Sequence, residues 1–385
     1  MKNNQLNPFV IGKYVSSDYF CDREKETEML LKQVRNGRNV TLISDRRIGK
    51  SGLISHLFAQ PAIQKQYYTI NVDLYATNSL AELVCMFGKE VYRSIQQATS
   101  WKEKFFQIIS AFRVGFKLDP VSGSPTFDIG IGDISAPDMT LEQVFDFLEQ
   151  ADKPCIVAFD EFQQIAEYDE KNIEALLRTY IQRCKKTQFI FAGSRKHLMA
   201  QMFLSPSKPF YQSTINLGLE PIPVDVYSAF AQQMFAKGRK SIAAETVVAV
   251  YDLCRGITWY MQVLLNEMYE LTKEGEQCPA EYIDTAMQNV IRVQEPFYLE
   301  MLANLPPKQK SVLFAVISEG EAKNITSQQF ISKHKLALTS SVQTAMRALQ
   351  EKDIVVKNED TYRVYDIFFA QYVKNYMLSE PIKTR

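Results

Sequence analysis

The sequence has few of the residues that build metal centres and histidine-based active sites. Its 385 residues include only three histidines, His56, His197 and His334, which lie far apart along the chain. The six cysteines form no Cys-x-x-Cys pair. These absences disfavour a zinc site and histidine-based catalysis. Scattered cysteines of this kind are typical of small buried hydrophobes in a reducing compartment.

The sequence also lacks a long apolar run and an excess of charge of either sign. No run approaches the roughly 20 residues that span a membrane, and residues 1–8 lack the apolar core of a signal peptide. We therefore expect a cytoplasmic protein without membrane contact. The formal net charge is +0, so contact with nucleic acid would need a local basic patch. A length of 385 residues predicts two or three domains.

A phosphate-binding loop is predicted between Asn39 and Ser51. An apolar run, Val40–Ile43, leads into a polar loop that closes on Gly-Lys-Ser and opens into a helix. Backbone N–H groups of such a loop and helix start point at one anion. Lys50 would reach the β- and γ-phosphates, and the Ser51 hydroxyl would bind Mg²⁺. The full pattern begins with glycine, where this chain has Ser44, so a helix start without phosphate binding is an equal alternative. The residues expected around the nucleotide here are Arg46, Arg47, Ile48, Gly49, Lys50, Ser51 and Gly52.

Two carboxylates follow a run of five apolar residues, Cys155–Phe159. Such a run is typical of a strand buried on both faces, and ligands collect at the carboxyl ends of these strands. Asp160 is predicted to hold Mg²⁺ through its water shell, and Glu161 to activate water for attack on the γ-phosphate. Ser194 ends another buried run and could bond the γ-phosphate or the attacking water. A helix cap, a surface acid pair and an ordinary turn are the plain alternatives.

The order of the apolar runs predicts an α/β protein with a mostly parallel sheet. Besides the strand before the loop, strands are expected at residues 67–74, 154–162, 188–194 and 213–217. A charged helix that begins near Phe20 would carry Met29, Leu30 and Val34 on one face. Helical periodicity at residues 79–113 precedes a hairpin or loop inserted at residues 114–138.

The second half of the chain changes character. Residues 224–292 have the pattern of a run of helices, and from Pro296 three helices precede a two-stranded hairpin, which is the winged-helix order. We therefore predict a P-loop ATPase core at 1–222, a helical lid at 223–295 and a winged-helix domain at 296–385. The predicted recognition helix, Thr339–Gln350, contains a single basic residue, Arg347. A packing or protein-interaction role for this domain is therefore as well supported as DNA binding.

Together these motifs resemble those of the archaeal-type ATPases of the STAND/AAA+ superfamily of P-loop NTPases. The resemblance covers nearly the whole chain, from the loop and the Asp160-Glu161 pair to the lid and the winged helix. It implies an ATP site with Lys50 and Ser51 as Walker A. It further implies Asp160 and Glu161 as Walker B, and Ser194 as sensor 1.

The same resemblance implies that the segment Phe9–Ile11, with Val10 and Ile11, and the segment near Arg23 line the adenine pocket. The chain departs from the family pattern at four residues: Ser44, Asp22, Thr258 and Trp259. Thr258 replaces a proline of the lid, and Trp259 stands where many relatives carry a sensor-2 arginine. These differences favour slow turnover, in which the bound nucleotide acts as a switch.

Three functions are consistent with the sequence. The first is an ATP-binding, Mg²⁺-dependent ATPase that works as a nucleotide-regulated switch between its ATP and ADP forms. The second is an interaction module that binds nucleotide without hydrolysing it. The third is a DNA-binding regulator that acts through the winged helix. A protein partner, a homo-oligomer and an arginine finger from Arg178, Arg183 or Arg195 are left open.

Overall fold

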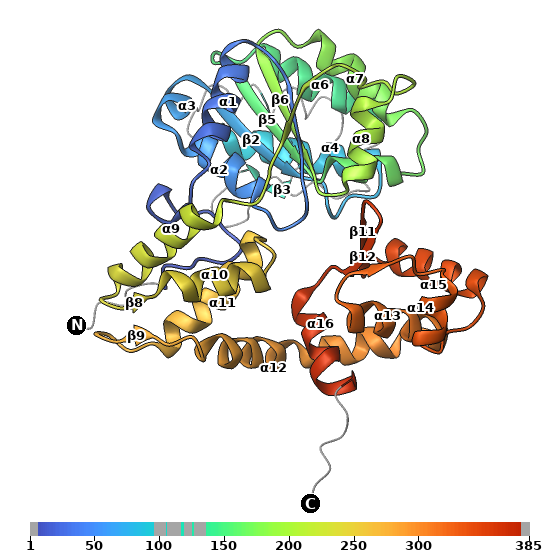
Figure 1. Ribbon diagram of the computed structural model, residues 1–385. Helices are drawn as coiled ribbons and strands as arrows, with labels where there is room; N and C mark the ends of the chain where they lie inside the picture. The colour runs from blue at the N-terminus through green and yellow to red at the C-terminus, as the bar shows by residue number, and fades with distance from the viewer. Residues whose placement is uncertain (1–6, 96–104, 106–116, 119–124, 127–135, 379–385) are drawn as a thin grey trace, which may run out of the picture. The chain divides into compact units, whose positions relative to one another are not determined.

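The computed structural model describes residues 7–95, 105, 117–118, 125–126 and 136–378 (Figure 1). The chain divides into two compact units. The core unit consists of Gly12–Tyr227 with Ile257–Trp259, and the C-terminal unit of Met1–Ile11, Ser228–Gly256 and Tyr260–Arg385. The predicted division into three domains at residues 222 and 295 stays a prediction.

The core unit is built on a five-stranded parallel sheet with the strand order β2-β5-β6-β1-β7. Its strands are β1 (Val40–Ile43), β2 (Tyr68–Asp73), β5 (Cys155–Asp160), β6 (Thr187–Gly193) and β7 (Ile215–Gly218). Strands β5 and β6 are buried along their whole length, as their apolar runs predict. Along β5, Val157 and Phe159 face one apolar cluster and Ile156 and Ala158 the other. The predicted parallel α/β sheet is therefore confirmed.

Helices cover both faces of this sheet (Figure 1). One face carries α1 (Glu24–Arg35), α2 (Lys50–Ala59) and α3 (Pro61–Gln66); the other carries α4 (Leu80–Ser94), α6 (Pro137–Glu149), α7 (Ile173–Arg183) and α8 (Lys196–Leu204). On α1, Leu30 and Val34 are buried, whereas Met29 is 41% exposed. The prediction that Met29 shares their face is wrong, because successive helical residues lie about 100° apart. The buried face runs through Thr27, Leu30 and Val34 instead.

Two predicted segments are described only in part. The helix expected from residue 79 is confirmed as α4 up to Ser94, and most of its remaining predicted range lies outside the described residues. In the predicted insertion, β3 (Lys117–Leu118) pairs antiparallel with β4 (Pro125–Thr126), which agrees with a hairpin. The alternating stretch at residues 127–131 lies outside the described residues.

The C-terminal unit begins with a mainly helical part. It is formed by α9 (Val224–Lys237) from Ser228 on, α10 (Ala244–Leu253), α11 (Thr258–Leu271) from Tyr260 on, and α12 (Tyr282–Ala303). A parallel ladder joins β8 (Ser241–Ile242) to β9 (Gln277–Cys278), and two residues per strand were too few to predict it. Phe9 is fully buried here, with its ring centroid 5.5 Å from that of Phe235 and 6.1 Å from that of Tyr269. Its ring therefore belongs to the core of this unit.

The last part of the unit has the predicted winged-helix order. Helices α13 (Pro307–Glu319), α14 (Gln328–Lys333) and α15 (Thr339–Glu351) precede a wing of β11 (Val355–Asn358) and β12 (Thr361–Val364). A third strand, β10 (Ala322–Lys323), pairs with β12 and was too short to predict. Helix α16 (Ile367–Val373) follows, and the Asp366 carboxylate caps it by accepting hydrogen bonds from the N–H groups of Phe368 and Phe369.

No helix of the described ranges is long and apolar enough to cross a lipid bilayer. The six cysteines all fall within the described residues; none of them forms a disulfide there, and all except Cys184 are buried. Their burial agrees with their prediction as small buried hydrophobes.

Candidate functional site

The loop between β1 and α2 has the geometry of an anion site. Strand β1 ends at Ile43 and α2 begins at Lys50, with Gly49 as its N-cap at φ 106°. Only glycine adopts that backbone angle without strain, which explains the residue type at this position. The first N–H groups of a helix have no partner within it and carry a partial positive charge. The start of α2 is therefore suited to bind phosphate oxygens.

Lys50 is buried inside this loop, with 5% of its surface exposed. Its Nζ donates hydrogen bonds to backbone carbonyls, at 2.9 Å to Asp45 O and 3.4 Å to Ser44 O. Burial lowers the pKa of Lys50, and the nearby carboxylates of Glu161 and Asp160 oppose that effect. The carbonyl oxygens accept hydrogen bonds from the ammonium but carry no formal charge to neutralise it, so its positive charge can attract an incoming anion.

Ser51 and Asp160 join the start of α2 to the end of β5. The Ser51 hydroxyl donates to Asp160 Oδ2 at 2.5 Å, and the Glu161 N–H donates to Asp160 Oδ1 at 3.0 Å. A hydroxyl and a carboxylate are the hard oxygen ligands that Mg²⁺ prefers. Within the described ranges, no cluster of three or more histidine, cysteine or acidic residues forms a metal cage. The pair fits Mg²⁺ carried in with a nucleotide, since this ion usually takes one or two protein ligands besides phosphate and water.

Replacing Asp160 with asparagine is expected to remove metal binding without lowering the melting temperature. Burial is the largest influence on the Asp160 carboxyl and raises its pKa, although the hydrogen bond from Ser51 opposes this. In the unfolded chain this carboxyl ionises at a lower pH than in the folded protein. Its negative charge therefore lowers the free energy of unfolding once the pH exceeds the pKa of the carboxyl in the unfolded chain. At neutral pH we expect Asp160→Asn to melt no lower than the wild type and to lose the Mg²⁺ enhancement of ATP affinity. Calorimetry and ATP titrations with and without Mg²⁺ measure both; a melting temperature more than about 3 °C lower would contradict the argument.

Glu161 lies at the centre of a hydrogen-bonded group. Its backbone is left-handed, at φ 52°, which is uncommon outside glycine and aims the side chain out of the strand direction. Ser194 Oγ, at the end of β6, donates to Glu161 Oε2 at 2.7 Å, and Arg46 Nε donates to Ser194 Oγ at 3.1 Å. The side-chain amide of Gln163 donates to the same Oε2 at 2.5 Å. The structure thus brings together the predicted residues Arg46, Glu161 and Ser194, and adds Gln163.

Sequence reasoning missed Gln163 because its role depends on a turn that has no hydrophobic period. Residues Phe162–Glu167 form a 3-10 helix directly after β5, which turns Gln163 back toward the strand ends. The signal available was a pair of glutamines, Gln163 and Gln164, directly after Phe162. Gln163 is 2% exposed, unlike most glutamines.

Gly193 makes room for this group. A Cβ at Gly193 would lie 2.4 Å from Gln163 Oε1 and 2.4 Å from Met199 Sδ. Gly218 ends β7 beside the same residue of β1, Ile43, yet its Cβ would meet nothing closer than 4.0 Å. We expect Gly193→Ala to lower the free energy of unfolding by about 1–3 kcal/mol through overpacking. The matched Gly218→Ala variant should change it by less than about 0.5 kcal/mol. Equal effects in urea titrations would show that the space at Gly193 is not needed.

The loop is also held by the first residues of α11, which belong to the core unit. Thr258 Oγ1 donates to Ile48 O at 3.3 Å, and the Trp259 N–H donates to Arg47 O at 3.1 Å. The Arg47 guanidinium lies 4.1 Å from the centroid of the Trp259 ring, a cation–π distance. Trp259, where the resemblance implies an arginine, therefore binds an arginine of the loop instead.

Arg23 supports the loop from its backbone side. Its guanidinium donates to Glu26 Oε1 at 2.6 Å, Glu220 O at 2.8 Å and Ile48 O at 3.4 Å, and the residue is 4% exposed. Its predicted contact with adenine stays a prediction, since these groups already engage its donors. Val10 and Ile11 belong to the C-terminal unit, and their predicted contact with the nucleotide likewise stays a prediction.

The absence of a side chain at Gly52 lets the Phe20 ring approach α2, because a Cβ at Gly52 would lie 3.3 Å from that ring.

Comparisons with known proteins agree with this arrangement. A family model described as "Probable winged helix domain" matches residues 296–375. Among solved structures, a Walker-type ATPase of Pyrococcus abyssi aligns with a TM-score of 0.66 and 18% identity, covering 95% of this chain and 99% of that one. The chain has the fold of a Walker-type ATPase with a C-terminal winged helix. No curated protein sequence matches it significantly.

Two structures from Aeropyrum pernix share this fold. The ORC2 protein, in its ADPNP and ADP complexes, aligns with a TM-score of 0.61 at 12% identity, covering 97% of each chain. The ORC1 protein in complex with DNA aligns with a TM-score of 0.51 at 15% identity, covering 93% of this chain and 94% of that one. At these identities the likeness establishes the fold alone. The predicted resemblance to P-loop ATPases of the AAA+ type is confirmed at that level.

Proposed function

We propose that this protein binds ATP together with Mg²⁺ and hydrolyses it to ADP and phosphate. The observation that carries the proposal is the hydrogen bond from Ser51 to Asp160 beside the buried ammonium of Lys50. It joins the start of α2 to the carboxyl end of β5, where parallel sheets bind their ligands. The Aeropyrum pernix ORC2 protein, whose structure was solved with ADPNP and ADP, has the same fold and supports the choice of adenine nucleotides.

Each residue of the site has a role in this proposal. Lys50 and the first N–H groups of α2 bind the β- and γ-phosphate oxygens. Ser51 and Asp160 would hold Mg²⁺, which neutralises phosphate charge when bound. Glu161 takes a proton from water as the water oxygen bonds to the γ-phosphorus. The bond from that phosphorus to the bridging oxygen breaks, and ADP leaves with the bridging oxygen.

We further propose that turnover is slow and that the nucleotide acts as a switch. The hydrogen bonds from Thr258 and Trp259 to carbonyls of the loop tie the first turn of α11 to the phosphate site. A change in the conformation of the loop on nucleotide binding or hydrolysis would therefore displace Thr258 and Trp259. The cysteines are mostly buried and form no disulfide in the described part of the chain, which supports a reducing compartment such as the cytoplasm as the place of action.

The proposal is tested by measuring phosphate release and ATP binding on the purified full-length chain, with and without Mg²⁺. We expect Mg²⁺-dependent release at a low rate, and binding by titration calorimetry. Binding without any release, in the presence or absence of duplex DNA, would contradict hydrolysis and favour a non-hydrolysing nucleotide module. Absence of ATP binding as well would contradict both the proposed hydrolysis and the non-hydrolysing nucleotide module.

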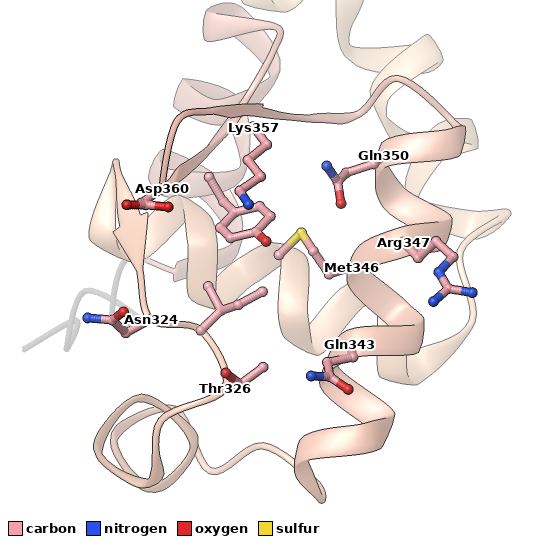
Figure 2. A pocket seen from close by; sticks show the side chains of 10 residues that line it. Asn324, Thr326, Gln343, Met346, Arg347, Gln350, Lys357 and Asp360 are labelled. Atoms are coloured by element: carbon pink, nitrogen blue, oxygen red, sulfur yellow. The ribbon is translucent and has the colours of Figure 1, made fainter. Parts of the chain in front are cut away.

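A groove on the winged helix favours DNA as a second candidate ligand. A cavity of about 510 Å³ lies between α15 and the wing, and Arg347 and Lys357 contribute to its lining. Figure 2 shows Lys357 of the wing and Met346 of α15 extending toward one another, while Gln343 and Gln350 line the helix side. The Aeropyrum pernix ORC1 protein, of the same fold, was solved in complex with DNA. A salt-dependent mobility shift of duplex DNA that Arg347→Ala and Lys357→Ala weaken would support this function, and no shift at low salt would contradict it.

A further inference from the structure

We propose that Gln163 is a positioning residue that ties one oxygen of Glu161 and leaves the other to receive the proton of the attacking water. The inference rests on the proposed ATP hydrolysis and assigns within it a residue that the loop and strand-end motifs do not include. Gln163 lies in the turn Phe162–Glu167, directly after the strand that carries Asp160.

Two donors converge on one oxygen of Glu161. The Gln163 amide Nε2 lies 2.5 Å from Glu161 Oε2, and Ser194 Oγ lies 2.7 Å from the same atom. Among the described residues, no hydrogen bond to Glu161 Oε1 is found. A protonated Oε2 could not keep both bonds at full strength, because the added proton occupies one of its lone pairs. The proton taken from water therefore goes to Oε1.

The amide of Gln163 is oriented by Glu161 and not by its other surroundings. Gln163 is 2% exposed, and its own Oε1 is a buried acceptor without a hydrogen-bond partner in the described part of the chain. Leaving such an acceptor unpaired costs free energy, which a methionine or leucine of similar size would avoid. The opposite orientation would place the amide oxygen against the Glu161 carboxylate. An amide at this position is therefore explained by its donation to Glu161, and Gly193 provides the space that it occupies.

Gln163 differs from Ser194 in what else it touches. The Ser194 hydroxyl also accepts a hydrogen bond from Arg46 of the loop, so its position depends on what the loop binds. Among the residues that the structure describes, the Gln163 amide donates to Glu161 alone. If the Arg46–Ser194 contact changes when phosphate enters the loop, Gln163 still fixes the carboxylate. Gln163 thus holds the Glu161 carboxylate by a hydrogen bond that does not depend on what the loop binds.

The first test compares ATP turnover and ATP affinity in Gln163→Met, which keeps the volume and removes the donor. We expect kcat to fall about 10- to 100-fold, the loss of one hydrogen bond to a charged group. The dissociation constant for ATP should change less than about twofold, since the Gln163 amide donates to Glu161, which is assigned to the proton transfer and not to phosphate binding. Gln164→Met is the matched control, because its amide bonds Glu167 at 3.2 Å and lies outside the group. A wild-type kcat in Gln163→Met would overturn the inference.

A double-mutant cycle separates positioning from general packing. In a Glu161→Gln background we expect Gln163→Met to change the residual turnover less than about twofold, because its effect passes through Glu161. The same fold loss in both backgrounds would overturn the inference. Should Gln163→Met fail to fold, Gln163→Glu keeps shape and size and replaces the test. Its kcat relative to wild type should fall as pH rises, because ionisation places a second negative charge beside Glu161; pH profiles parallel to wild type would overturn the inference.

These outcomes are distinct from failure of the proposed function. No turnover by the wild-type chain overturns both hydrolysis and the positioning role. Turnover by the wild type that is equal in Gln163→Met overturns the positioning role alone.

Discussion

Glu161→Gln is expected to lower ATP turnover by about 10²–10⁴-fold, the usual contribution of a general base. The substitution keeps the size of the side chain and removes the carboxylate that would accept the proton of water. ATP affinity should stay within a few-fold of wild type, because Lys50, Ser51 and Asp160 are unchanged and form the proposed phosphate and metal contacts. Steady-state phosphate release and calorimetric titration measure the two quantities separately.

The control for this variant is Glu167→Gln, six residues further along the same segment. Glu167 pairs with Arg195 and is partly exposed, so loss of its charge tests whether any nearby carboxylate would matter. We expect less than a twofold change in turnover for this control. Turnover of Glu161→Gln equal to that of the wild type would remove Glu161 as the base.

Lys50→Ala is expected to abolish measurable nucleotide binding. Removing one member of a buried charge pair costs at least about 2 kcal/mol, or roughly 30-fold in the dissociation constant. The rise in melting temperature that saturating ATP gives the wild type should then disappear. Thermal unfolding with increasing ATP measures this, and Lys196→Ala is the control, because Lys196 pairs with Asp45 on the exposed side of the loop.

A second substitution at the same position, Lys50→Met, tests the stability of the chain in the absence of ATP. Burial holds the pKa of Lys50 below its ordinary value, so the unfolded chain binds that proton more tightly than the folded chain. The charged ammonium therefore costs stability at neutral pH, and this cost is relieved only as pH rises toward the ordinary pKa of lysine. We expect Lys50→Met, which keeps the apolar stem, to melt no lower than the wild type. Retained ATP stabilisation in Lys50→Ala would contradict the role of Lys50.

The parts of the site that follow from strand ends could be predicted from the sequence. Asp160-Glu161 and Ser194 follow apolar runs, and a parallel sheet brings the carboxyl ends of such runs to one edge. Gly49 and Lys50 were predictable because a left-handed N-cap and a phosphate-binding lysine need those residue types. The order of strands and helices, and the winged helix, follow from the same hydrophobic periods.

The parts that depend on side-chain direction could not be predicted. Gln163 enters the site through a short 3-10 turn, and Arg47 finds the Trp259 ring more than two hundred positions away along the chain. Arg23 has a buried guanidinium bound to backbone carbonyls, which no pattern of neighbours in sequence reveals. The Phe9 ring packs against Phe235 and Tyr269, which an isolated apolar segment of sequence does not reveal, and the contact of its segment with adenine stays a prediction.

A crystal structure of the full chain with Mg²⁺ and a non-hydrolysable ATP analogue tests the central claim most directly. We predict triphosphate density over Gly49–Ser51, with Lys50 Nζ drawn from its carbonyls to the β- and γ-phosphates. The same structure should show a metal ion at Ser51 and Asp160, with their direct hydrogen bond opened. Analogue density elsewhere, or an unchanged Ser51–Asp160 bond with no metal at saturating ligand, would contradict the account.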